Sequence, residues 1–191
     1  MSTGQDLPIV QPDGREAWRA WLEENHASRA GVWLKFAKKG SPTPTVTYSE
    51  AIEEAVCFGW IDGQVRAHDE HFYLQRFTPR RPKSKWSQIN REKATRLLAE
   101  GRVRPPGLAQ IEAAKADGRW EAAYPAQSAA HVPDDLQEAL DHNPRAKEFF
   151  ETLTGSTRYA FLYRLHNVTK PEARAKRIAG YIELLNEGKT V

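Results

Sequence analysis

The residues best suited to chemistry lie between Thr47 and Trp86, above all in the run RFTPRRPKSKW at positions 76–86. Guanidinium groups bind phosphate or carboxylate with paired hydrogen bonds, and aromatic faces bind a base or a sugar. The two prolines of this run stiffen the backbone, so the charges are expected to be held in place. The sequence therefore predicts an anion-binding site in this run, with the cations Arg76, Arg80, Arg81, Lys83 and Lys85 and the aromatic residues Phe77 and Trp86. The alternative is a solvated cationic loop that pairs with Glu50, Glu53 or Glu54.

Asp62, in the run CFGWIDG at positions 57–63, is the candidate catalytic residue. A half-buried carboxylate near Trp60 would orient an arginine or act as a general base. Beside Gly63, the same aspartate would also suit a tight turn with no chemical role. Both interpretations remain open at the level of sequence.

Other catalytic and metal chemistry has little support in the sequence. His68 and His71 lie three residues apart without a third ligand, so no metal and no cofactor are predicted. Cys57 fits a small buried residue at a helix end better than a nucleophile with His68 or His71 as its base. The chain contains no GxSxG, HExxH, CxxC or GxGxxG arrangement.

A second basic cluster follows near the C-terminus, and its members are Arg158, Lys170, Arg174 and Arg177. Arg174 precedes Ile178 by one helical turn and therefore belongs to the same stripe. At the edge of an apolar interface, this arginine would pair with an acid or reach into a cleft.

The hydrophobic pattern predicts the elements that position these residues. Thr47 and Glu50 form a capping box for a helix over 48–58. A strand is expected in GVWLKFAKK from Gly31, and a β-hairpin over 61–67 and 72–77, with residues 78–84 as a loop. Residues 1–13 read as an extended lead-in. A helix is expected at 15–25, and another from Ser84 or Lys85 to Glu100 with Trp86, Ile89 and Leu97 inward. A further helix, which starts at the prolines 105 and 106 and runs to Ala116, is expected to have Leu108, Ile111 and Ala114 or Lys115 along one side. The last four are expected at 134–141, 144–153, from Ser156 or Thr157 to Asn167, and at 171–186.

These elements predict an α+β fold, with a small antiparallel or mixed sheet of about three strands packed by helices. We expect an α+β domain over residues 1–120, a linker over 121–133 and a helical segment over 134–191 that docks on the domain. The length of 191 residues suits one domain with a small appendage.

Charge and composition narrow the class of protein. The net charge of +3 is too small to indicate nucleic acid alone, although ten basic residues between Arg76 and Arg104 face only Glu92 and Glu100 there. The single cysteine excludes an intramolecular disulfide. The N-terminal residues show no secretory signal, and no apolar run is long enough for a membrane span, so a cytoplasmic protein is predicted.

The chain resembles the YdeI/OmpD-associated (OmdA, bacteriocin-protection) family. The resemblance lies in GVWLKFAKKG, TYSEAIEEAVCFGWIDGQV, YLQRFTPRRPKSKWSQIN and GRVRPPGLAQIEAAKADGRW, with further matches from VPDDLQEAL onward. It implies a role in envelope stress or in tolerance of bacteriocins and antimicrobial peptides, and an outer-membrane porin as partner. It implies no catalytic mechanism. The family motif positions that the resemblance carries over as ligand-binding candidates are seven, namely Trp60, Asp62, Arg76, Arg80, Arg81, Lys85 and Trp86.

Three functions compete at this stage. The leading hypothesis is a stress or protection protein with a cationic, aromatic-lined cleft for an anionic ligand, namely a nucleotide, a nucleic acid or an acidic metabolite. The second is an enzyme that uses Asp62 with an arginine clamp on a carboxylate or phosphate substrate. The third is a protein-interaction factor that uses exposed aromatic residues in a contiguous apolar patch. The sequence does not set the oligomeric state.

Overall fold

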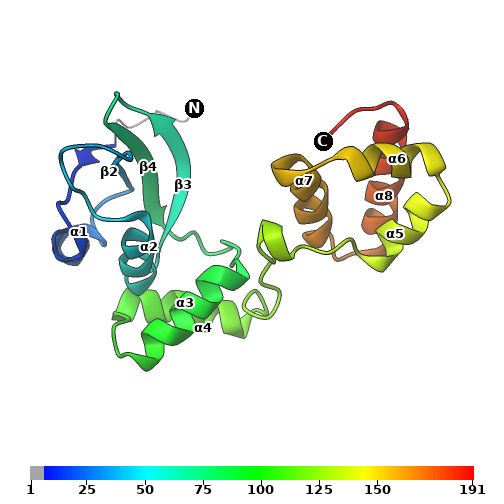
Figure 1. The fold of residues 1–191 in the computed structure, drawn as a ribbon. Coiled ribbons are helices and arrows are strands. Elements are labelled where there is room, and N and C mark those ends of the chain that lie inside the picture. Colours follow the sequence, from blue (N-terminus) through cyan, green and yellow to red (C-terminus); the bar gives the residue numbers. More distant parts are fainter. Residues whose placement is uncertain (1–6) are drawn as a thin grey trace. The chain divides into compact units, whose positions relative to one another are not determined.

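The computed structural model describes residues 7–191, and the first half of the predicted lead-in lies outside this range. The described residues form two compact units, 7–123 and 124–191, and the boundary falls within positions 121–133. The described residues hold eight α-helices and a four-stranded mixed sheet (Figure 1). The predicted α+β class is confirmed. The docking of the C-terminal segment on the first unit stays a prediction.

The sheet of the first unit contains β1 (Ile9–Val10), β2 (Val32–Ala37), β3 (Trp60–Ala67) and β4 (Phe72–Pro79) in the order β1-β2-β4-β3. β1 is parallel to β2, and the other pairs are antiparallel. β1 was not expected, because the sequence predicted an extended lead-in there without a strand of the sheet. The predicted start of the 78–84 loop was wrong, since β4 continues through Thr78 and Pro79, which pair with Ile61 and Trp60.

Four helices complete the first unit, namely α1 (Arg15–Asn25), α2 (Tyr48–Cys57), α3 (Gln88–Ala99) and α4 (Pro105–Ala116). The predicted capping box of α2 is confirmed, with Thr47 and Glu50 bonded in both directions. α3 begins later than predicted, because the Ser87 hydroxyl accepts from the Asn90 amide and caps the helix.

Two residues expected in the core are exposed. Ile89 is 47% exposed, since it lies in the first turn of the late-starting α3. Leu108 is 43% exposed, because the inward face of α4 consists of Gly107, Ile111 and Ala114. These three residues are spaced at i, i+4 and i+7, so they form one face of the helix. Because Gly107 has no apolar side chain, the hydrophobic pattern did not indicate this face.

The two faces of the sheet differ in character. Cross-strand partners share a face, so Val32, Leu34 and Phe36 of β2 lie with Phe77 and Gln75 of β4. This inner face packs on α1 and α2, where Phe77 meets the ring of Trp18 edge-on. The opposite face carries Trp33, Lys35, Leu74, Arg76 and Thr78, with Ile61 and Arg66 from β3, and we call it the outer face.

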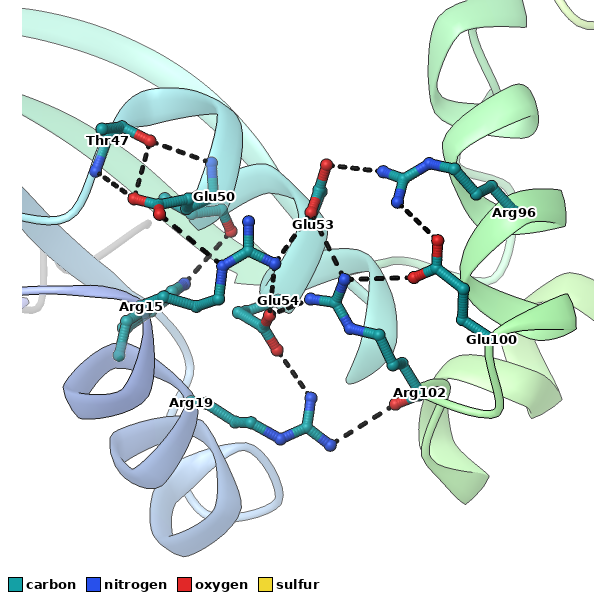
Figure 2. A network of polar contacts seen from close by, with 11 residues as sticks. Arg15, Arg19, Thr47, Glu50, Glu53, Glu54, Arg96, Glu100 and Arg102 are labelled. Carbon is teal, nitrogen blue, oxygen red and sulfur yellow. Dashed lines mark hydrogen bonds and ion pairs between the residues drawn. The ribbon is translucent and has the colours of Figure 1, made fainter.

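A network of ion pairs surrounds α2 (Figure 2). Glu54 is fully buried and contacts Arg15, Arg19 and Arg102, with Arg19 Nη1 at 2.6 Å from its Oε2. Arg96 Nη2 lies 2.6 Å from Oε1 of Glu53. Burial alone would raise the pKa of Glu53, but the hydrogen bond and charge of Arg96 outweigh it and lower the pKa. The network thus ties α1, α3 and the segment after α3 to α2.

The C-terminal end of α2 approaches the N-terminal end of α4 with little space between their backbones. The Arg104 amide donates to the Cys57 carbonyl at 2.9 Å. A Cβ atom on Gly107 would lie 2.2 Å from that same carbonyl oxygen. Gly59 ends α2 with φ +73°, and a Cβ there would lie 2.8 Å from the Pro106 carbonyl oxygen. Two glycines therefore permit this helix contact.

The second unit is helical and has its own core. Its elements are a short 3-10 turn, η1 (Gln127–Ala129), and four α-helices, α5 (Asp134–Asp141), α6 (Pro144–Thr152), α7 (Gly155–His166) and α8 (Pro171–Asn186). The predicted helices match these bounds to within one or two residues, because proline or glycine marks most of their starts. Phe150, Phe161 and Tyr181 pack edge to face at the centre of this unit.

Candidate functional site

A cavity of about 610 Å³ opens at the end of the hairpin, on the outer face of the sheet. Its charged lining consists of Arg76, Arg80 and Arg81, and none of the lining residues found in the described chain is acidic. Ile61, Gly63, Gln64, Thr78, Pro79, Pro82, Ser84 and Ala30 complete the wall. Positive charge in a concave site focuses the field and attracts anions. The cavity is therefore suited to a small anion.

Arg80 organises the loop that follows β4. Its side chain is 5% exposed, and its guanidinium carbon lies 3.7 Å from the centre of the Trp86 ring. Its Nη1 donates to the Lys85 carbonyl at 3.2 Å. The Arg81 amide donates to the Ser84 hydroxyl at 2.9 Å. These contacts stabilise the conformation of the loop, in agreement with the stiff loop predicted from its two prolines.

A β-bulge in β3 lies directly opposite Arg76. Asp62 pairs with Phe77 and Val65 pairs with Gln75, so two residues, Gly63 and Gln64, face one. The Gln75 side chain donates to the Gly63 carbonyl at 2.8 Å and fixes the bulge. Nε of Arg76 is buried and has no hydrogen-bond partner within residues 7–191. The bulge places Gly63 and Gln64 in the wall of the cavity.

The structure divides the seven predicted site residues. Arg76, Arg80 and Arg81 line one cavity, whereas Trp60, Asp62, Lys85 and Trp86 are not among its lining residues. Asp62 lies on the inner face, opposite to Arg76, and accepts from the Tyr48 hydroxyl at 2.8 Å. The ring nitrogen of Trp60 donates to the His26 carbonyl at 3.3 Å. The predicted convergence of Asp62 with the arginines was wrong. Side chains alternate along β3, so the Asp62 side chain lies on the inner face, whereas Arg76 lies on the outer face.

Trp86 and Lys85 act on the cavity indirectly. Trp86 is 1% exposed and supports the Arg80 guanidinium, while the exposed Lys85 contributes its backbone carbonyl. The sequence did not single out Gly63, Gln64, Thr78 or Ser84 as wall residues. The alternation of side chains along β4 could have identified Thr78, since it shares a face with Arg76. The bulge that places Gly63 and Gln64 in the wall has no clear pattern in the sequence.

The proposed pairing of the loop with acids on α2 was wrong. Glu53 and Glu54 pair instead with Arg15, Arg19, Arg96 and Arg102 (Figure 2). Arg104 is also paired, with Glu23 at 2.6 Å. Three of the ten basic residues over 76–104, namely Arg96, Arg102 and Arg104, are therefore paired with acids outside the loop.

Cys57 is buried at the end of α2, where burial and the charge of Glu54 raise the pKa of its thiol to about 11. A thiol with this pKa is a poor nucleophile near neutral pH. No group of three or more His, Cys, Asp or Glu side chains in the described chain is arranged to hold a metal ion.

We expect Cys57 to resist modification by a thiol reagent such as iodoacetamide in the native protein. At about pH 8, roughly one Cys57 thiol in a thousand would be ionised, and burial blocks access to it. The labelling rate, measured by mass spectrometry, should therefore be far lower than in urea. Equal rates in the two conditions would contradict the buried position.

The second basic cluster does not form one site. Arg174 pairs with Asp135 and donates to the Leu165 carbonyl at 2.9 Å, which confirms the expected pairing with an acid. It also lines two cavities of this unit. Arg158 lies over the Phe150 ring at 4.5 Å and lines a different cavity. Lys170 and Arg177 are exposed and belong to none of these walls.

Fold and site together define a two-unit α+β protein whose first unit carries an arginine-lined cavity. Residues 10–110, more than half of the chain, match a domain of unknown function (DUF8412), and the chain belongs to that family. Residues 129–188 match the family described as Bacteriocin-protection, YdeI or OmpD-Associated. No curated protein and no solved structure matches the chain.

The two matches refine the resemblance seen in the sequence. The bacteriocin-protection resemblance is confirmed for the helical second unit. The motifs CFGWIDG and RFTPRRPKSKW instead lie within the stretch matched by the domain of unknown function. The arginine-lined cavity therefore lies within the part of this chain that matches that domain. No helix among residues 7–191 has both the length and the apolar character needed to cross a membrane.

Proposed function

We propose that the first unit is a binding module for an anionic ligand, which enters the cavity formed by Arg76, Arg80 and Arg81. One observation carries this proposal, namely that three arginine residues line one cavity with no acidic residue among the described lining residues. A volume of about 610 Å³ suits a ligand the size of a nucleotide or an acidic metabolite.

The protein would act in the cytoplasm, in a stress or protection role suggested by the family of the second unit. The enzyme hypothesis is weaker, since Asp62 lies on the inner face and is bonded to Tyr48. A protein-interaction role has no specific support, because the exposed apolar residues, such as Val65 and Leu108, belong to different elements.

Arg81→Gln and Arg76→Gln are expected to weaken binding of inorganic pyrophosphate about tenfold or more, since each removes a charged donor. Isothermal titration calorimetry at constant salt would measure the dissociation constants. Arg81 is exposed, so its replacement should leave the fold intact. Citrate in place of pyrophosphate would tell a carboxylate site from a phosphate site.

Lys83→Gln is the matched control, because Lys83 is an exposed cation of the same loop and does not line the cavity. It should bind pyrophosphate like the wild type. Equal affinities for the wild type, Arg76→Gln and Arg81→Gln, or no binding of either anion, would rule out the proposed site.

A further inference from the structure

Cations continue from the arginine cavity across the outer face of the sheet. Arg76 pairs with Trp33 on β2, and Leu74 pairs with Lys35 on one side and with Arg66 on the other. Because cross-strand partners share a face, Lys35, Arg66 and Arg76 all project from the outer face. They lie on three adjacent strands of the order β2-β4-β3.

Aromatic rings lie beneath two of these cations. The Arg66 guanidinium carbon is 4.3 Å from the centre of the Trp33 ring, and the Lys35 ammonium is 4.0 Å from that of the Phe72 ring. Such pairs combine a flat apolar surface with a positive charge above it. A nucleobase can stack on an aromatic ring or on a guanidinium plane, while the cation pairs with the neighbouring phosphate.

The outer face has no acidic residue along the described strands, since Asp62, the one carboxylate of β2, β3 and β4, lies on the inner face. The inner face is occupied by α1 and α2 (Figure 1). Eight residues of β4 extend about 23 Å from Phe72 to Pro79, at roughly 3.3 Å per residue. The acidic residues Asp69 and Glu70 mark one end of this surface, and the arginine cavity marks the other.

We infer that the ligand of the first unit is a single-stranded nucleic acid, which lies along the outer face with one phosphate in the arginine cavity. This inference rests on the proposed function and names the ligand class. A small anion needs only the cavity, whereas a strand would also use Lys35, Arg66 and Trp33. The absence of a glycine-rich phosphate loop is consistent with binding through side chains.

The test uses fluorescence anisotropy of labelled oligothymidylate and oligouridylate with the whole chain, at several salt concentrations. Arg66→Gln and Lys35→Gln, which lie outside the cavity, should each weaken binding about fourfold at physiological salt. Each should also reduce the slope of log K against log salt by about 0.7. Pyrophosphate binding should stay unchanged in both variants. The two oligonucleotides distinguish DNA from RNA.

Lys115→Gln is the control, because Lys115 is an exposed cation on α4. Binding of pyrophosphate without binding of either oligonucleotide would overturn this inference and leave the proposed function in place. Equal weakening by Lys115→Gln would indicate diffuse attraction and overturn it as well. Loss of oligonucleotide binding in Arg81→Gln alone, with Arg66→Gln and Lys35→Gln unaffected, would restrict the site to the cavity and also overturn it.

Discussion

Gly107→Ala is expected to destabilise the first unit by about 3 kcal/mol or more. The new Cβ atom would lie 2.2 Å from the carbonyl oxygen of Cys57 and 2.8 Å from that of Val56. Both are backbone atoms, so no side-chain rotation relieves the overlap. α4 must therefore move away from α2, which would also strain the hydrogen bond from the Arg104 amide to Cys57.

Urea unfolding followed by tryptophan fluorescence would measure this effect. All six tryptophans, at positions 18, 21, 33, 60, 86 and 120, belong to the first unit, so the signal reports on that unit alone. Gly180→Ala is the matched control, since Gly180 is also inside a helix but has open space around it. It should leave the fluorescence transition unchanged and stabilise α8 by about 0.5 kcal/mol. A fluorescence midpoint for Gly107→Ala equal to that of the wild type would refute the close contact.

Glu54→Gln should cost the first unit about 3 kcal/mol of unfolding free energy, because it removes the buried charge at the centre of the network in Figure 2. Arg19 and Arg102 would keep their positions and lose their main counter-charge. Glutamine preserves the size of the side chain, so the effect would reflect charge and hydrogen bonding and not a cavity.

Glu23→Gln provides the comparison for Glu54→Gln. Glu23 also pairs with an arginine, Arg104, but both side chains are more than 40% exposed. An exposed pair of this kind contributes about 0.5 kcal/mol. Fluorescence-detected urea unfolding of the two variants should therefore give clearly different midpoints. If Glu54→Gln were as mild as Glu23→Gln, the network would be a surface feature and not the tie between helices.

Local signals account for the parts of the fold that the sequence could predict. The capping box at Thr47 and Glu50 set the start of α2, and prolines at the first turn set the starts of α6 and α8. β1 could not be predicted, because a strand of two residues shows no measurable alternation of polar and apolar side chains. Its pairing with Trp33 and Leu34 is a tertiary contact, which no local pattern indicates.

The candidate site could be predicted only in part, because its residues come together through strand alternation and a bulge. The basic run contains the three arginines that line the cavity, and their role in binding stays a prediction. Asp62 lies only a few positions from the bulge, yet its side chain leaves the sheet on the opposite face. The proximity of Asp62 to Trp60 and Gly63 in the sequence therefore did not predict the direction of its carboxylate.

The strand order β1-β2-β4-β3 leaves β3 with a single partner among the described strands. An open edge of this kind can pair with another chain and begin aggregation. The bulge at Gly63 and Gln64 breaks the regular backbone pattern of that edge, so an incoming strand would meet regularly spaced donors and acceptors only in two short stretches, Trp60 to Asp62 and Val65 to Ala67. The irregularity that shapes one wall of the cavity thereby also limits the length of uninterrupted pairing between copies of the chain along this edge.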